Sequence, residues 1–160
     1  MSQPALRRAG APQIAALAVL LAVVLVACGT VSTSPPAPTP ADFAGIAALL
    51  LRNGLHVDRI VSGEAGCDDL DLGRTAIALD AAGLDQTTPT RIYMYIFRNR
   101  ASFERMRPAV DACARSYVTD PAAFESVESS PFVVAGAGPW APEFRAAVRD
   151  AIVEAAGTGG

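Results

Sequence analysis

The chain has 160 residues, and its thirteen basic and sixteen acidic side chains leave a formal net charge of −3 at pH 7. All thirteen basic residues are arginines. An acidic chain without a basic stripe lacks the electrostatic footprint of a nucleic-acid-binding protein, so we expect no nucleic-acid partner.

The first 27 residues have the composition of an export signal. Arg7 and Arg8 precede an entirely apolar run at residues 14–27, and the segment contains no acidic residue. A secretory core spans ~7–15 apolar residues, whereas a membrane-crossing helix needs ~20. We therefore interpret residues 1–27 as a signal peptide. An uncleaved membrane anchor and an ordinary cleaved signal with an incidental cysteine are the alternatives.

Leu25-Val26-Ala27-Cys28 closes this segment and resembles the lipobox of bacterial lipoproteins at all four positions. The resemblance covers only the first 28 residues. It implies that the Cys28 thiol receives a diacylglyceryl group through a thioether and that a lipoprotein signal peptidase cleaves before Cys28. Two or more acyl chains, at ~0.8 kcal/mol per buried CH₂, anchor a protein firmly. The expected location is therefore the extracytoplasmic face of the cell membrane or of an outer membrane.

The predicted mature chain divides into a tether, a domain and a short tail. Residues 28–40 comprise the lipidated cysteine and a segment rich in serine, threonine and proline, a composition that favours a stiff spacer. Residues 41–157 suit a single domain, and residues 158–160 form the tail. Without Arg7 and Arg8, eleven basic residues remain against sixteen acidic ones, so the mature charge is −5. The acyl chains must then provide the anchor, because an acidic domain is not attracted to anionic lipid.

Apolar spacing in the domain predicts three helices and up to five strands. Caps and helical periodicity predict helices from a capping box at Thr39 to Gly54, from Arg100 to about Tyr117, and from Pro142 to Gly157. Pro108 should kink or split the second helix. Short apolar or alternating runs predict strands at Leu55–Val61, Arg74–Leu79, Thr90–Phe97, Phe124–Val127 and Phe132–Ala135.

The expected order, α-β-β-β-α-β-β-α, is typical of the α+β class. We predict a small antiparallel sheet of four to five strands with helices packed mainly on one face. Thr90–Phe97 is apolar on both faces, which indicates a central strand. If it and Phe132–Ala135 were parallel, the connection between them would be a right-handed crossover.

Cys67 and Cys113 remain once Cys28 carries lipid. Two cysteines in an exported domain are most simply one disulfide, and two buried free thiols are the alternative. The loop-entropy model gives about 4 kcal/mol for a ring of this size.

Three further groups of residues are candidates for binding. Gly136, Gly138 and Trp140 lie between a predicted strand and a predicted helix, where backbone amides can bind an anion; turn geometry and tryptophan packing are the alternative. Clustered acids can hold Ca²⁺, although the spacing here departs from the EF-hand pattern and a solvated loop is the alternative. These acids are Glu64, Asp68, Asp69 and Asp71. Four arginines near the second helix either dock an acidic partner or form local ion pairs, and they are Arg98, Arg100, Arg105 and Arg107.

His56 is the only histidine, and no spacing places it beside a nucleophile. One histidine and two cysteines do not supply a zinc site without carboxylates, so we expect neither a metal nor a cofactor. The leading hypothesis is a non-catalytic, lipid-anchored envelope protein that binds another protein, a polymer or a small ligand. A module for small molecules, anions or Ca²⁺ is the first alternative, and an enzyme of unrecognised type is the second.

Overall fold

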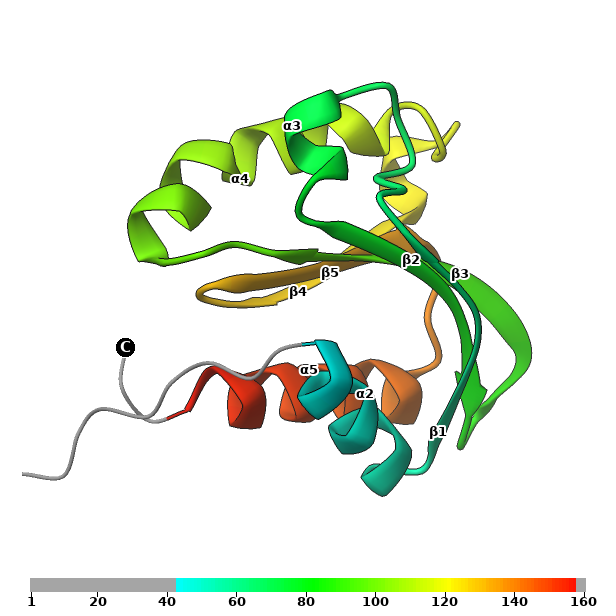
Figure 1. Ribbon diagram of the computed structural model, residues 1–160. Helices are drawn as coiled ribbons and strands as arrows, with labels where there is room; N and C mark the ends of the chain where they lie inside the picture. Colours follow the sequence, from blue (N-terminus) through cyan, green and yellow to red (C-terminus); the bar gives the residue numbers. More distant parts are fainter. Residues whose placement is uncertain (1–42, 158–160) are drawn as a thin grey trace, which may run out of the picture. The chain divides into compact units, whose positions relative to one another are not determined.

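The computed structural model describes residues 43–157, which form a curved five-stranded sheet between two layers of helices (Figure 1). Every neighbouring pair of strands is antiparallel, and the strand order is β1-β2-β3-β5-β4. The elements are α2 (Phe43–Arg52), β1 (Leu55–Ser62), α3 (Leu70–Gly73), β2 (Ala76–Gly83), β3 (Gln86–Ile96), α4 (Arg100–Ala114), the 3₁₀ helix η1 (Pro121–Ala123), β4 (Phe124–Ser129), β5 (Phe132–Ala137) and α5 (Pro142–Ala156).

The predicted α+β class and the predicted order of the main elements are confirmed. The central position of the strand around Tyr93 is confirmed as well, because β3 pairs with β2 on one side and β5 on the other. The β3–β5 pair is antiparallel, so no crossover of the parallel kind occurs between them. The predicted signal peptide, Cys28, the tether and the tail lie outside the described residues.

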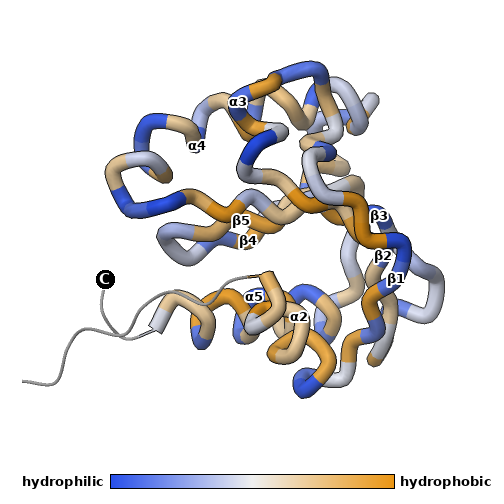
Figure 2. The backbone as a smooth tube through the Cα atoms, viewed as in Figure 1, coloured by the Kyte–Doolittle hydropathy of each residue, from blue (hydrophilic) through white to orange (hydrophobic). Residues whose placement is uncertain are grey.

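The expectation that helices cover mainly one face is wrong. α2 and α5 cover one face of the sheet, and α4 with the short α3 covers the other (Figure 1). The reason lies in β3, where Ile92 and Met94 enter one core while Tyr93 and Tyr95 enter the other. A strand that is apolar on both faces needs cover on both. Figure 2 shows the hydrophobic residues concentrated along the strands and on the helices of the α2–α5 layer.

The α2–α5 layer holds the larger core. Ile46 and Leu50 of α2 are fully buried, as are Phe144, Val148 and Ile152 of α5. These positions recur at helical spacing, so each helix presents one apolar stripe to the sheet. Each large side chain buried in this way contributes about 1.5–3 kcal/mol before the entropy of ordering is counted.

The α4 layer holds a second core over the opposite face. Its main members are Tyr95, Phe97, Val110, Cys113 and Val133. α4 begins at the Asn99 cap, where the side chain accepts a hydrogen bond from the Ser102 amide at 2.9 Å. It continues through Pro108 without splitting and ends at Ala114, earlier than the predicted end near Tyr117.

Two strand boundaries depart from expectation at the β2–β3 hairpin. Residues 80–89, expected as a connection, extend both strands to a tight turn at Leu84 and Asp85. Leu84 has a φ of 54° and Gly83 a φ of 139°. A Cβ on Gly83 would lie 2.4 Å from the carbonyl oxygen of Gly54, so only glycine permits this approach.

β1 contains a bulge that sequence alternation does not reveal. Asp58 pairs with Asp80 and Val61 pairs with Ala78, so one extra residue is inserted between them. Arg59 takes a φ of 43° there. The bulge puts Val61 on the face opposite to Leu55 and Val57, which corrects the even alternation expected along this strand. Within residues 43–157, none of the helices combines the length and the hydrophobicity that a membrane crossing requires.

Candidate functional site

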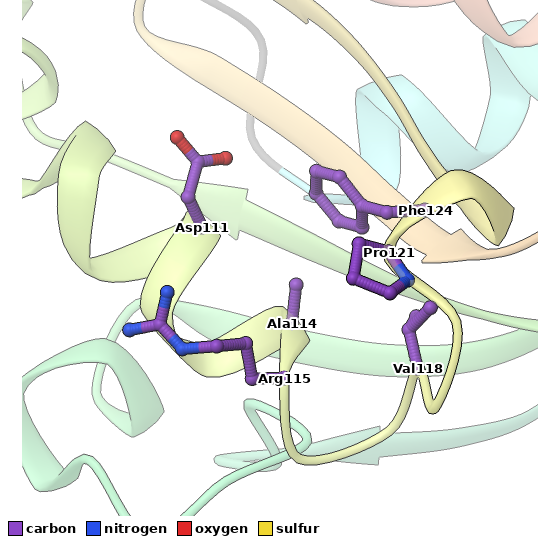
Figure 3. A pocket seen from close by; sticks show the side chains of 6 residues that line it. All are labelled: Asp111, Ala114, Arg115, Val118, Pro121 and Phe124. Atoms are coloured by element: carbon purple, nitrogen blue, oxygen red, sulfur yellow. The ribbon is translucent and has the colours of Figure 1, made fainter.

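A small pocket lies at the C-terminal end of α4, where the chain turns through η1 into β4 (Figure 3). Its cavity volume is about 240 Å³. Asp111 and Arg115 form the wall on the α4 side, and Val118, Pro121 and Phe124 face them (Figure 3). Ala114 lies on the floor between the two walls.

Local hydrogen bonds shape this turn. The Val118 amide donates to the Ala114 carbonyl at 2.9 Å and draws the chain back across the helix end. Asp120 then caps η1, because its carboxylate accepts from the Ala122 amide at 2.9 Å. Pro121 occupies the first turn of η1, where its missing N–H costs nothing. The pocket is therefore the space that a helix end and a capped 3₁₀ turn enclose.

The floor of the pocket is apolar. Ala114 and Val118 are buried, and the half-buried Phe124 packs against the core of the α4 layer. An apolar ligand in the cavity would continue this core, and each CH₂ that it buries contributes about 0.8 kcal/mol.

The rim on the α4 side is charged, and Asp111 there is already engaged. Arg107 Nη1 donates to Asp111 Oδ1 at 2.5 Å, and Arg107 also pairs with Glu128 of β4. Burial lowers the pKa of Arg107, but its hydrogen bonds to Asp111 and Glu128 outweigh that effect and the pKa is raised. Arg107 thus stays charged and fastens α4 to β4 beside the pocket.

Arg115 is the other charged group at the pocket, and its guanidinium has no partner among the described residues. Most arginines of the domain pair with an acid. Arg105 instead donates to the hydroxyl of Ser102 at 3.5 Å, and Arg98 resembles Arg115 in lacking a partner within residues 43–157. Asp111 is the nearest acid one helical turn before Arg115, but Arg107 holds its carboxylate. The pocket therefore combines an apolar floor with an arginine that no carboxylate of the described residues pairs with.

The predicted disulfide is present beside this pocket. Cys67 and Cys113 are joined with an S–S distance of 2.06 Å and a Cα–Cα distance of 5.4 Å. Cys113 is 3 % exposed and immediately precedes Ala114 of the pocket floor. The bond ties the loop before α3 to the last turn of α4, which holds the pocket wall in place. No thiol of the described domain is left as a nucleophile, because both of its cysteines are bonded.

The predicted turn at Gly136, Gly138 and Trp140 serves packing. Trp140 is 5 % exposed and meets Phe144 edge to face, with ring centroids 5.7 Å apart. Its indole Nε1 donates to the Ala137 carbonyl at 3.2 Å. A Cβ on Gly138 would lie 2.3 Å from Cγ of Glu125, so this position needs glycine because of close packing.

The amides at the start of α5, which were expected to bind an anion, bind the protein's own carboxylate. Asp85 of the β2–β3 turn accepts from the Glu143 and Phe144 amides, both at 2.9 Å. Gln86 accepts from the Ala141 amide at 3.1 Å. Because these donors are occupied within the protein, turn geometry and packing are the alternative that the structure supports at this turn.

Three of the four acids around Cys67 have separate partners within the domain. Asp69 caps α3 by accepting from the Asp71 and Leu72 amides, and Asp71 pairs with Arg74 at 3.0 Å. Glu64 pairs with Arg91 at 2.8 Å. Among residues 43–157, histidine, cysteine, aspartate and glutamate side chains form no group of three or more that could hold a metal ion.

The arginines near the second helix are largely engaged as well. Arg100 pairs with Glu104 at 2.8 Å one turn along α4, and Arg107 is the residue already placed between two acids. Local ion pairs therefore account for these two, while Arg98 is left exposed.

A second charged group links β1, β2 and β3. Asp80 of β2 is the one buried charged side chain of the described domain, at 7 % exposure. It pairs with Arg59 and with Arg91 Nη1 at 3.2 Å, and Arg91 also donates to the Arg59 carbonyl at 2.9 Å. The exposed His56 and its neighbour Asp58 line an adjoining hollow of about 220 Å³.

This second group is self-contained. Arg59 and Arg91 each pair with a carboxylate of the domain, so neither guanidinium is available to an external ligand. Its evident role is to hold the β1 bulge against β2 and β3. The α4 pocket, with its unpaired arginine, is the better candidate for an external ligand.

Sequence reasoning missed both the pocket and the Arg59–Asp80–Arg91 network. Asp120 followed by Pro121 is a helix-start signature, and it could have marked the turn after α4. Nothing in the local pattern shows that Arg115 lacks a partner, because Asp111 lies four residues from both Arg107 and Arg115 and only the structure shows that it pairs with Arg107.

Comparisons with protein-family models, with curated proteins and with solved structures found no match to this chain.

Proposed function

We propose that this chain is a lipid-anchored extracytoplasmic protein of a bacterial envelope, and that its domain binds a ligand or partner without catalysing a reaction. The observation that carries the proposal is the Cys67–Cys113 disulfide behind a lipobox-like segment. Disulfides form and persist in oxidising compartments outside the cytoplasm and are rare inside it. The bond and the N-terminal pattern thus support the same compartment from independent parts of the chain.

The non-catalytic part of the proposal is supported by how the reactive side chains are used. Both cysteines of the domain are bonded, and His56 is exposed on β1 with aspartate rather than a nucleophile as its neighbour in the hollow. Nucleophilic catalysis requires a base within hydrogen-bond reach of the attacking group. The pocket at the end of α4 is the proposed binding site.

The test of anchoring is a pair of variants in the native envelope. Cys28→Ala removes the lipid acceptor, whereas Ala27→Gly keeps the lipobox pattern and serves as the matched control. We expect the wild type and Ala27→Gly to incorporate a labelled fatty acid and to need detergent for extraction. Cys28→Ala should remain unlabelled and either stay uncleaved or leave the membrane.

Mass spectrometry of the mature N-terminus decides the outcome. A wild-type chain that begins with an unmodified residue, or a Cys28→Ala variant that fractionates and is processed like the wild type, would remove the lipid anchor from the proposal. The disulfide would then support export of the domain from the cytoplasm but not its lipidation.

A further inference from the structure

We infer that the pocket at the end of α4 takes a small monocarboxylate with a compact apolar body, whose carboxylate pairs with Arg115. This inference deepens the proposed function and rests on its claim that the domain is a binding module. Three features of the pocket support the inference: the cavity volume, the apolar lining and the arginine that lacks a carboxylate partner.

The cavity sets the size of the occupant. Sites for drug-sized ligands measure about 300–1,000 Å³. At about 240 Å³, this pocket lies below that range. It suits a single ring or a short branched chain rather than a nucleotide or a long acyl chain.

The floor and the facing wall set the apolar part of the ligand. Ala114, Val118 and Phe124 present hydrocarbon to the cavity, and two of the three are buried in the free protein. A strongly hydrated ion such as acetate or inorganic phosphate would leave this surface unused, whereas an aryl or branched alkyl group would cover it.

Arg115 sets the charged part. Its guanidinium has no partner in the described domain, and its planar fork matches the two oxygens of a carboxylate. Arg107 pairs with both Asp111 and Glu128, so those two carboxylates share one positive charge and Arg115 is left as the lining arginine without a carboxylate partner.

Asp111 limits the charge that the pocket accepts. It lines the cavity together with Arg115, so a second negative charge on the ligand would meet its carboxylate. The local balance therefore favours one negative charge over two. This separates a monocarboxylate from a dianionic phosphate ester.

The experiment uses benzoate as the probe and the purified full chain in lipid nanodiscs, with empty nanodiscs as the blank. Ligand-observed NMR titration should give saturable binding with a Kd on the order of 1 mM, as expected for a ligand of this size. Benzamide, which has the same shape without the charge, should bind about fivefold more weakly or worse. Acetate should not saturate in the same range.

Four variants separate the contributions. Arg115→Gln should weaken benzoate binding by about fivefold or more, while Arg98→Gln, the matched removal of an unpaired surface arginine, should leave it unchanged. Asp111→Asn should tighten binding about two- to threefold, because it removes a repelling charge. Ala114→Leu, whose added atoms project into the cavity, should abolish binding.

The inference is overturned if benzoate does not saturate the wild type, or if Arg115→Gln binds as Arg98→Gln does. If Arg115→Gln and Arg98→Gln unfold at the same temperature, weaker binding by Arg115→Gln does not result from a less stable fold. A negative result for benzoate binding would not affect the proposed lipid anchor, because lipidation is tested at Cys28 and not at Arg115.

Discussion

The disulfide between Cys67 and Cys113 offers the sharpest test of how the domain is held together. We consider its removal in two ways, by reduction of the wild type and by the double substitution Cys67→Ala with Cys113→Ala. A thioether at Cys28 would survive reduction, so the reductant acts on the domain alone. The two routes also separate the covalent bond from the packing of the buried Cys113 sulfur.

The magnitude follows from the 46-residue separation of the two cysteines. Closing a loop of that length removes about 4 kcal/mol of conformational freedom from the unfolded chain at 25 °C. A small domain has only about 5–15 kcal/mol of total stability. Loss of the bond should therefore remove a large fraction of the stability while leaving both cores intact at low temperature.

Trp140 provides the assay, because it is the only tryptophan and is 5 % exposed. It lies in the α2–α5 layer, whereas the disulfide lies in the α4 layer across the sheet. Urea unfolding followed by Trp140 fluorescence thus reports whether the two layers unfold together. With a slope of about 1.5 kcal/mol per molar urea, reduction should lower the midpoint by about 2.7 M.

A midpoint shift below about 0.5 M would refute the reasoning, since the bond would then not constrain the unfolded chain as the loop-entropy account requires. Two thiols labelled in the denatured, unreduced protein would refute it more directly. If the alanine pair is less stable than the reduced wild type, the difference measures the packing of the Cys113 sulfur.

Three further predictions concern groups buried or bonded inside the domain. Asp85→Ala should cost about 1–2 kcal/mol in chemical denaturation, since it uncaps α5, and an effect no larger than that of the exposed Asp150→Ala would contradict the capping role. Asp80→Ala should cost about 1–3 kcal/mol because it removes the buried carboxylate shared by Arg59 and Arg91 and leaves Arg91 with Glu64 alone, and a neutral result would show that the network adds nothing. Burial raises the pKa of all three tyrosines, that of Tyr117 to about 12. The unfolded chain then loses its phenolic protons first, so stability should fall from about pH 10 to pH 12, and phenolate absorbance that rises at pH 10 in the folded protein would contradict this.

The anchoring proposal and the pocket proposal place different demands on the chain. The proposed anchoring depends on the lipobox-like residues 25–28. Ligand binding depends on a cavity whose shape comes from the end of α4, η1 and β4. A variant library confined to the pocket should therefore alter binding while membrane fractionation stays constant.

Sequence by itself determined the elements whose signals are local. The stripe on α5 repeats at helical spacing, Asn99 caps α4, and β3 is apolar on both faces, so each could be recognised without knowledge of its neighbours. The disulfide followed from counting cysteines in an exported domain. The two-faced β3 also contained the information that both faces need helices, although the helix count alone suggested a single covered face.

Tertiary structure decided what depends on residues far apart in the chain. Asp85 reaches the amides of α5 across 58 positions, which turns an expected anion site into a helix cap. The bulge at Arg59 reverses the faces of β1 by inserting one residue, and the Arg59 guanidinium meets Asp80 on the next strand. Arg115 has no partner among the described residues, while Arg107 pairs with Asp111 one turn along α4 and with Glu128 on β4. Side-chain periodicity records which face of an element is buried, whereas the pairing of charges is set by distances that exist only after the layers have packed.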